Sequence, residues 1–334
     1  MTQTVLVTGG TGFVGGWTVV ALLRRGYAVR TTVRDLAKAE AVRRAVGQEI
    51  DPGDRLEIVA ADLLADTGWV EAAAGCESVL HIASPMELSN ETNEALVAAA
   101  RGGTLRVLRA AVEAGAARVV MTSSTAACTP AKPLTRAIDE RDWTDPDQPG
   151  LGAYRLSKAL AERAAWDFMD GKPTSLTTIL PGAVFGPVLS KGQRGSVSII
   201  QNLLAGRPPV LPRLAFNITD VRDLAELHVQ AMVTPQAAGE RFIAMGDPLW
   251  YAEVAATLKD RLGQKASAVP TVRMPDWAAR ATALVSPQMK SLLPLLGRTQ
   301  KFSHEKADRL LGFSPRPPRD TVADCGASLC HTRT

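Results

Sequence analysis

Hydrophobic and polar residues follow two alternating patterns in the first half of the chain. Short runs of β-branched and apolar residues, typical of strands buried on both faces, are separated by segments with apolar residues at helical spacing. The runs cover residues 4–8, 27–33, 56–62, 78–84, 118–124 and 176–182, and the predicted helices cover 14–25, 36–46, 69–74, 91–114 and 151–169. This alternation predicts an α/β fold with a doubly wound parallel sheet and right-handed crossovers.

The pattern changes after Pro181. The stretch PGAVFGPVLSKGQRG, residues 181–195, is rich in glycine and proline and is predicted as loop, followed by a short helix over 198–206. One more strand–helix–strand alternation covers 214–219, 221–232 and 241–246, and prolines interrupt amphipathic helices beyond 249. We therefore predict a sheet domain over residues 1–180, with returns to the sheet around 215–246, and a smaller, mostly helical lobe within residues 181–334.

Composition narrows the class of protein. The 334 residues are 46% hydrophobic and 22% charged, which is typical of a globular chain with a substantial core. Arginine-rich pieces lie on amphipathic segments, so the net charge of +4 predicts solvated helix faces rather than a nucleic-acid partner. The four cysteines form no C-x-x-C pair, which predicts no metal site and a reducing cytoplasm. No signal peptide and no transmembrane helix are expected, so we predict no membrane association.

The stretch VTGGTGFVGG, residues 7–16, closes the first predicted strand and opens the first helix. Gly10, Gly12 and Gly15 spell G-x-G-x-x-G, whereas Gly9, Gly12 and Gly15 spell G-x-x-G-x-x-G. Glycines at such a turn let backbone N–H groups approach a pyrophosphate, and the helix N-terminus favours negative charge. The strand–turn–helix context predicts a dinucleotide site.

Two charged residues after the second strand indicate which dinucleotide binds. Arg34, nineteen residues beyond Gly15, stands where NAD enzymes place a carboxylate for the ribose hydroxyl. Its guanidinium suits a 2′-phosphate, and Lys38 would add a second positive charge. Asp35 is a competing group that could reach the ribose instead. We predict NADP(H) in preference to NAD(H).

The ends of the third and fourth strands offer weaker signals. Asp62 could accept a hydrogen bond from an adenine amino group while Leu63 packs against the ring, although Asp62 also fits a helix N-cap. Ala83 and Ser84 are small residues that would permit close approach of a cofactor.

The strongest chemical signal is spread over two elements. Tyr154 and Lys158 are four residues apart on a predicted helix and therefore lie on one face. A lysine cation lowers the pKa of a nearby phenol and prepares it for proton transfer. The fifth strand ends in Ser123 and Ser124, and the second of these would orient a substrate carbonyl, with its neighbour as the alternative.

At these motifs the sequence resembles the extended short-chain dehydrogenase/reductase superfamily. TGGTGFVGG matches its T-G-x-x-G-x-x-G turn, SST its active-site serine and YRLSK its Y-x-x-x-K, within a resemblance over roughly residues 4–245. TTVRDLAKAEAV, HIASPM and VVMTSSTAA look like the group of dihydroflavonol reductases, cinnamoyl-CoA reductases and microbial carbonyl reductases. The resemblance implies reversible, NADPH-dependent reduction of an aldehyde or ketone to an alcohol.

The resemblance also assigns residues. Catalysis is expected from Ser124, Tyr154 and Lys158. Cofactor contacts are expected from Thr8, Gly9, Gly12, Phe13, Val14, Gly15, Arg34, Lys38, Asp62, Leu63, Ala83, Ser84, Tyr154, Lys158, Pro181, Gly182 and Val184. Plausible walls of the substrate pocket, each with ordinary packing as its alternative, are Met86, Ala127, Cys128, Thr129, Phe185 and Leu189. Few polar groups lie nearby in the sequence, which favours an uncharged, fairly apolar carbonyl substrate, with a coenzyme A thioester still open.

Two other functions stay open. Sugar-nucleotide epimerases and dehydratases of the superfamily usually carry a Tyr-Gly pair shortly after the serine, and TAACTPAKP lacks it. A non-catalytic NADP-sensing regulator would need neither the serine nor Tyr-x-x-x-Lys, and both are present. The sequence does not identify a proton-relay residue, and it allows a monomer or a homodimer.

Overall fold

Seven parallel strands form the main sheet of the protein. The structure is a computed structural model that describes residues 3–85, 93–132, 134–190 and 195–331. The strand order is β3-β2-β1-β4-β5-β6-β9. The strands are β1 (Thr4–Val7), β2 (Ala28–Val33), β3 (Leu56–Ala60), β4 (Ser78–His81), β5 (Arg118–Thr122), β6 (Ser175–Pro181) and β9 (Arg241–Ala244). The order reverses between β1 and β4, which creates a crevice at the carboxyl ends of the strands. The predicted doubly wound α/β fold is confirmed.

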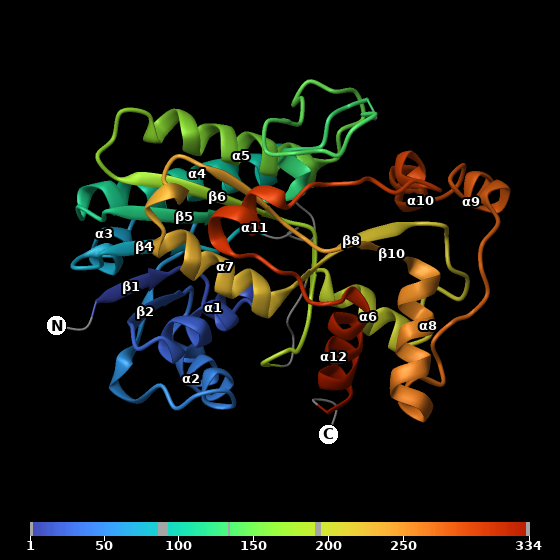
Figure 1. Ribbon diagram of the computed structural model, residues 1–334, viewed down its shortest axis with the longest axis horizontal. Helices are drawn as coiled ribbons and strands as arrows, with labels where there is room; N and C mark the ends of the chain where they lie inside the picture. Colours follow the sequence, from blue (N-terminus) through green and yellow to red (C-terminus); the bar gives the residue numbers. More distant parts are fainter. Residues whose placement is uncertain (1–2, 86–92, 133, 191–194, 332–334) are drawn as a thin grey trace.

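Helices cover both faces of this sheet (Figure 1). One face is covered by α1 (Phe13–Arg24), α2 (Ala39–Gly47) and α7 (Val221–Val233), and the other by α3 (Trp69–Ala73), α4 (Asn93–Glu113) and α5 (Ala153–Met169). Alternate residues of β1 point to opposite faces: Val5 and Val7 pack in the core with α1, whereas Leu6 packs in the core with α3 and α4. Burial on both faces explains the continuous apolar runs of the strands.

A smaller lobe lies beside the sheet domain (Figure 1). It contains a three-stranded sheet in the order β10-β8-β7. Its strands are β7 (Ala183–Phe185), β8 (Ala215–Asp220) and β10 (Pro248–Trp250). The later helices of the chain are α6 (Val197–Leu204), α8 (Tyr251–Leu262), α9 (Asp276–Thr282), α10 (Pro287–Leu292), α11 (Glu305–Leu311) and α12 (Pro318–His331). Short 3₁₀ turns are η1 (Leu36–Lys38), η2 (Gly53–Arg55), η3 (Thr125–Ala127), η4 (Pro235–Ala237), η5 (Gly263–Ala266) and η6 (Leu293–Leu295).

The structure corrects three local predictions. Of the two late strands expected to return to the main sheet, only β9 does, beside β6; β8 pairs with β7 and β10 instead. The edge of β6 is taken by β9, so β8 has no place there. A short strand, β7, lies within the stretch predicted as loop. The predicted helix over 36–46 begins as a 3₁₀ turn, η1, which Asp35 caps by accepting a hydrogen bond from the Ala37 N–H.

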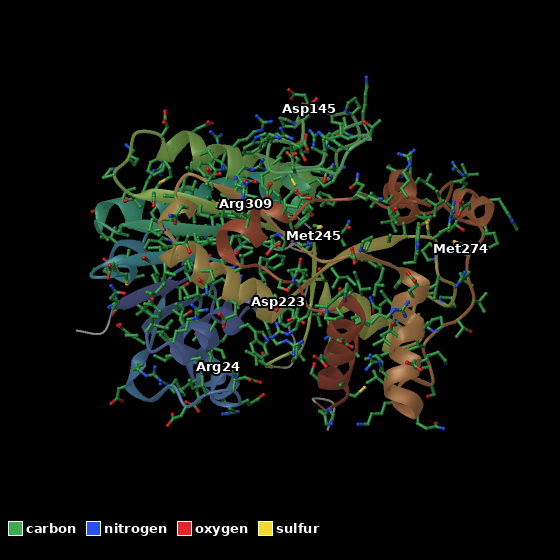
Figure 2. All side chains as sticks on the ribbon, in the orientation of Figure 1. Arg24, Asp145, Asp223, Met245, Met274 and Arg309 are labelled. Carbon is green, nitrogen blue, oxygen red and sulfur yellow. The ribbon has the colours of Figure 1, made fainter. Side chains whose placement is uncertain are left out.

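A small apolar cluster lies at the end of β9. Met245, near the centre of Figure 2, packs with Cys128, Leu180 and Ile243, all of them buried. Elsewhere, Arg222 of α7 bridges the buried Asp220 of β8 and the half-exposed Asp324 of α12. These contacts hold the C-terminal helix against the sheet domain. In the described part of the chain, no helix is both long and apolar enough to cross a membrane.

Candidate active site

The glycine turn after β1 is built around one carbonyl oxygen. Gly9 has φ +81°, and its carbonyl accepts a hydrogen bond of 2.9 Å from the Gly12 N–H. A Cβ at Gly15 would lie 2.2 Å from that oxygen, and a Cβ at Gly12 would lie 3.1 Å from it. Gly10 is constrained separately, because a Cβ there would lie 2.5 Å from the Thr31 hydroxyl. The Gly9–Gly12–Gly15 spacing therefore describes the turn. Gly10 is a glycine for another reason, because a larger residue there would collide with the Thr31 side chain of β2.

The Thr8 hydroxyl joins the glycine turn to the end of β4. Its oxygen accepts hydrogen bonds from the Ile82 and Ala83 N–H groups, at 3.0 and 2.9 Å, and lies 3.0 Å from His81 Nδ1. Because the oxygen already accepts two bonds, its proton is donated to His81. A Cβ at Gly9 would lie 3.1 Å from the Ala83 Cβ, so the small residue at 83 makes room for the turn.

The end of β2 carries two free cations. Arg34 and Lys38 are exposed, and neither side chain makes a hydrogen bond or ion pair with another described residue. The Asp35 carboxylate, the competing group, is engaged in capping η1 through the Ala37 N–H at 2.9 Å. The arrangement leaves the guanidinium and the ammonium available to an anion.

Asp62 and Leu63 follow β3 at its carboxyl end, and Asp62 is not a helix N-cap, because α3 begins at Trp69 with Gly68 as its N-cap. Asp62 accepts a hydrogen bond of 3.0 Å from the Leu64 N–H, which is a local turn contact. Leu63 is half-buried, and a Cβ at Gly103 of α4 would lie 2.8 Å from its Cβ. Gly103 thus provides the space in which Leu63 packs.

The two serines after β5 have different partners. Ser123 is 2% exposed, and its hydroxyl donates a 2.6 Å hydrogen bond to Glu162 Oε2. The Ser124 hydroxyl only accepts a weaker bond of 3.2 Å from the Ala126 N–H at the start of η3. The Ser124 O–H remains able to donate to another group, whereas that of Ser123 is used inside the protein.

Tyr154 and Lys158 lie in the first turns of α5. Tyr154 is 42% exposed, and Lys158 is 8% exposed. No hydrogen bond or ion pair reaches the Lys158 amino group from the residues that the structure describes. A buried cation without a partner is costly, so this group calls for a ligand. Its positive charge adds to burial in lowering the pKa of His81.

The segment after β6 approaches the same edge. The Gly182 N–H donates to the Thr219 hydroxyl at 3.0 Å, and a Cβ at Gly182 would lie 2.3 Å from the Asn217 carbonyl oxygen. The Thr125 hydroxyl, next to Ser124, donates to the Pro181 carbonyl at 3.3 Å. Val184 lies in β7 and is half-buried. This segment is therefore held between β5 and the small sheet.

Most of the expected pocket walls lie inside the protein. Ala127, Cys128, Thr129, Phe185 and Leu189 are all buried, with exposures from 0% to 8%. Leu189 packs on α1, where a Cβ at Gly16 would lie 3.2 Å from its Cδ1, and burial raises the pKa of the Cys128 thiol. Such burial is consistent with the packing alternative. Met86 lies outside the described residues.

The sequence analysis missed a buried ion pair beside the serines. Glu162 of α5 is 0% exposed, and Arg241 of β9 donates to its Oε1 through Nε at 2.9 Å. One signal could have indicated Glu162, since it continues the four-residue spacing of Tyr154 and Lys158 along α5. Nothing in the local pattern indicates Arg241, because its partner is 79 residues away.

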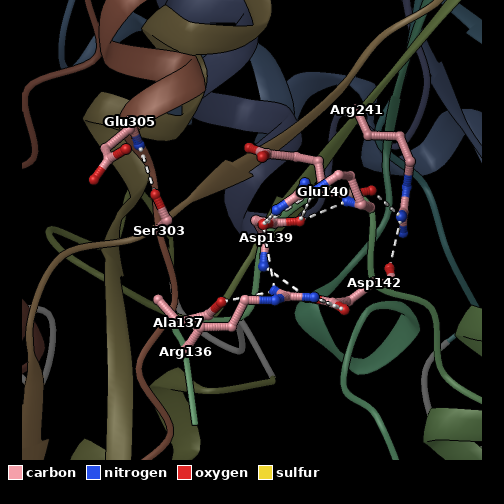
Figure 3. Close-up of polar contacts among 9 residues, drawn as sticks. Arg136, Ala137, Asp139, Glu140, Asp142, Arg241, Ser303 and Glu305 are labelled. Carbon is pink, nitrogen blue, oxygen red and sulfur yellow. Dashed lines mark hydrogen bonds and ion pairs between the residues drawn. The ribbon is translucent and has the colours of Figure 1, made fainter. Parts of the chain in front are cut away.

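The loop between β5 and α5 is tied down at several points (Figure 3). Arg136 makes two hydrogen bonds of 2.7 Å to the Asp142 carboxylate, and Ile138 pairs with the segment that includes Ser303. Arg241 donates to the Glu140 and Asp142 carbonyls at 2.7 and 2.8 Å. The loop that connects Ser124 to Tyr154 is therefore anchored on β9.

Two buried histidines predict acid sensitivity of the fold. Burial lowers the pKa of His81 to about 3 and that of His228 to about 4, from 6.5. The unfolded chain gains protons at these side chains as the pH falls below 6.5, whereas the folded chain does not. The free energy of unfolding should therefore fall by about 1.4 kcal/mol per pH unit for each histidine between pH 6.5 and their folded pKa values.

Urea unfolding of the wild type and of His228→Gln between pH 6.5 and 4.5 tests this prediction. The variant should show the shallower dependence on pH, because one buried histidine is gone. Equal slopes would contradict it. Carboxylates such as Asp139, whose pKa is lowered to about 2 mainly by its hydrogen bond with Arg141, lose their contribution only at lower pH.

The fold and the site together define a class of protein. A strand–glycine turn–helix at the switch point of a doubly wound sheet defines a dinucleotide-binding α/β protein. Ser124 follows β5 at the carboxyl edge of the sheet, and α5, which carries Tyr154 and Lys158, packs against η3 directly after Ser124. No group of three or more His, Cys, Asp or Glu side chains that could hold a metal ion occurs among the described residues.

Comparison with known proteins identifies the family. The NAD dependent epimerase/dehydratase family matches residues 5–244. The chain is 34% identical to a dihydroflavonol 4-reductase of Zea mays over 77% of this chain and 74% of that protein. It is 37% identical to cinnamoyl-CoA reductase 1 of Petunia hybrida over 72% of each. The crystal structure of Gre2 from Candida albicans in complex with NADPH matches with a TM-score of 0.83 and 26% identity, over 99% of this chain and 100% of that one.

The chain belongs to the NAD dependent epimerase/dehydratase family, which lies within the extended short-chain dehydrogenase/reductase superfamily. The resemblance inferred from the glycine turn, the serine pair and Tyr-x-x-x-Lys is thereby confirmed.

Proposed function

We propose that the protein is an NADP(H)-dependent carbonyl reductase, which converts an aldehyde or ketone to an alcohol and runs in reverse as an alcohol dehydrogenase. The observation that carries the proposal is the half-exposed Tyr154 phenol one helical turn from the buried Lys158 ammonium, which has no partner among the described residues. The helix that carries both packs against η3, which follows Ser124. The family and its reductase members support an NAD(P)-dependent reductase.

The residues fit the cofactor. The glycine turn leaves no room for a Cβ at Gly15 and only tight contact for one at Gly9 or Gly12. The start of α1 would face a pyrophosphate, and Arg34 and Lys38 suit a 2′-phosphate. The ammonium of Lys158, which has no partner among the residues that the structure describes, would bind the nicotinamide ribose. The reduced nicotinamide, when bound, supplies the hydride.

The side chains at the edge of β5 and α5 supply the proton. Ser124 donates a hydrogen bond to the carbonyl oxygen and orients it. As the carbonyl carbon accepts a hydride with its electron pair, the oxygen takes the proton of the Tyr154 hydroxyl. Lys158 stabilises the resulting phenolate by its positive charge. In the alcohol-oxidising direction the phenolate removes the same proton.

We propose an uncharged, fairly apolar carbonyl compound as the substrate. The relatives' names point to dihydroflavonols and cinnamoyl-CoA, so both belong in a test panel with aryl ketones, ketoesters and aliphatic aldehydes. Oxidation of NADPH, followed by its absorbance, should occur with at least one of these carbonyl compounds. Absence of turnover with every class, while NADPH still binds, would contradict the proposal.

Replacement of Arg34 by alanine should alter cofactor preference. An arginine–phosphate contact contributes about 1.5–3 kcal/mol, so KM for NADPH should rise by roughly 10–100-fold while KM for NADH changes little. Arg109→Ala, which removes an exposed arginine of α4, is the matched control. Equal effects on both cofactors would remove the role assigned to Arg34.

A further inference from the structure

We propose that the buried Glu162–Arg241 pair positions Ser124, Tyr154 and Lys158 for proton transfer; this inference rests on the proposed function. Glu162 is a positioning residue, since it contacts none of the reacting groups. Tyr154, Lys158 and Glu162 follow one another at four-residue spacing on α5, so they form one stripe of the helix. Glu162, the last of the three, is the buried residue that holds α5 against the sheet.

Both oxygens of the Glu162 carboxylate are fully used. Oε1 accepts hydrogen bonds from the Thr178 hydroxyl at 2.7 Å and from Arg241 Nε at 2.9 Å. Oε2 accepts from the Ser123 hydroxyl at 2.6 Å and from Arg241 Nη2 at 3.3 Å. Thr178 and Arg241 belong to β6 and β9, and Ser123 directly follows β5. A longer bond of 3.4 Å to Oε1 comes from the Trp166 indole N–H within α5. One carboxylate thus joins the helix of Tyr154 and Lys158 to two strands of the main sheet and to the residue that follows a third.

The contact with Ser123 is the one that bears on catalysis. Ser123 immediately precedes Ser124, so holding its side chain in the interior directs the next residue to the edge of the sheet. The same carboxylate holds α5. Glu162 therefore contacts both the segment that carries Ser124 and the helix that carries Tyr154.

Arg241 extends the network to the loop that joins these two residues. Its Nη1 donates to the Glu140 and Asp142 carbonyls, as Figure 3 shows, and its guanidinium lies 3.6 Å from the Trp143 ring centroid. Glu140 in turn accepts a hydrogen bond from the Ile243 N–H at 3.0 Å. The pair thus fixes both ends and the middle of the connection from β5 to α5.

The physical chemistry of buried ion pairs favours positioning over stability. The desolvation of two charges offsets much of their attraction, and well-packed apolar residues often stabilise a core as well. A fully hydrogen-bonded charge pair does fix side-chain geometry. Proton transfer depends on such geometry, since a misplacement of about 1 Å can cost roughly 10²-fold in rate.

The test compares Glu162→Gln, Ser123→Ala and the double variant Glu162→Gln/Arg241→Gln. For Glu162→Gln we expect kcat to fall by about 10–100-fold, with the NADPH dissociation constant and the KM for NADPH unchanged. Ser123→Ala removes one hydroxyl without burying a charge, and its kcat should fall as well, by a smaller factor. The double variant removes both charges and allows an amide–amide contact, so it should regain part of the lost kcat.

The control is Arg118→Met. Arg118 lies at the amino end of β5, on the opposite edge of the sheet, and donates to the Ala231 carbonyl at 2.9 Å. This variant should lower Tm and leave kcat per NADPH-binding site unchanged. Normalising each rate by bound NADPH removes any unfolded fraction from the comparison.

Specific outcomes would overturn the inference. The pair would be structural only if kcat is unchanged in both Ser123→Ala and Glu162→Gln. The same conclusion would follow if Glu162→Gln does not fold and Ser123→Ala keeps its full kcat. Parallel losses of kcat and NADPH affinity would do the same. The proposed function has its own test: it fails if Tyr154→Phe retains wild-type turnover in the same assay. If Tyr154→Phe is inactive while the Glu162 and Arg241 variants are fully active, only the positioning role is excluded.

Discussion

Tyr154→Phe should lower kcat for carbonyl reduction by about 10²–10⁴-fold, the usual contribution of a positioned general acid. The substitution removes only the hydroxyl oxygen from a side chain that is 42% exposed, and no hydrogen bond of that hydroxyl to a described residue is broken. The fold and the Tm should therefore stay as in the wild type. NADPH binding should also persist, because Lys158 and the glycine turn are untouched.

Kinetics with the best carbonyl substrate, together with NADPH titration by fluorescence, check this expectation. Tyr27→Phe is a matched control, since it removes a phenol hydroxyl from a partly buried residue beside α1. A full kcat in Tyr154→Phe would exclude the phenol as the proton donor. If NADPH affinity falls by the same factor as kcat, the phenol acts in cofactor binding instead of proton transfer.

Gly15→Ala should abolish useful NADPH binding while most of the fold remains. Its Cβ would lie 2.2 Å from the Gly9 carbonyl oxygen and 2.9 Å from the carbonyl carbon, and both are backbone atoms that a side-chain rotation cannot move. The turn must therefore shift away from α1. Because the N–H groups of the turn are the expected pyrophosphate donors, a displacement of about 1 Å should weaken NADPH by roughly 100-fold or more.

Titration calorimetry and thermal unfolding separate binding from folding in this variant. Gly47→Ala is the matched control, because Gly47 ends α2 on the surface with nothing within 4 Å of an added Cβ. It should bind NADPH like the wild type. Wild-type affinity in Gly15→Ala would show that the turn tolerates a side chain and would remove it from the cofactor site.

Several parts of the fold and the candidate site were predictable from local patterns. Short continuous apolar runs and helical spacing predicted the parallel strands and crossover helices, because a sheet buried on both faces needs apolar residues along the whole strand and its covering helices need one apolar face. The glycine turn was predictable since its steric demand involves residues only six apart, Gly9 and Gly15. Tyr154 and Lys158 were predictable as neighbours because helix geometry alone brings them together.

Other features depended on contacts between distant segments. The sequence left Ser123 and Ser124 as alternatives, and only the hydrogen bond from Ser123 to Glu162 distinguishes their surroundings. Residues 214–219 read as another strand of the main sheet, yet β9 occupies the edge of β6 and β8 joins the small sheet.

The sequence by itself determined the class of fold, the dinucleotide turn and the spacing of the tyrosine and lysine, since each follows from interactions within a few residues. Tertiary structure alone decided that Arg241 meets Glu162 and that the expected pocket walls are buried. The physical reason is that contacts between strands depend on which strands pair and in which register. The placement of β9 beside β6 brings together side chains 79 residues apart, and no local pattern of hydrophobic and polar residues specifies that partner.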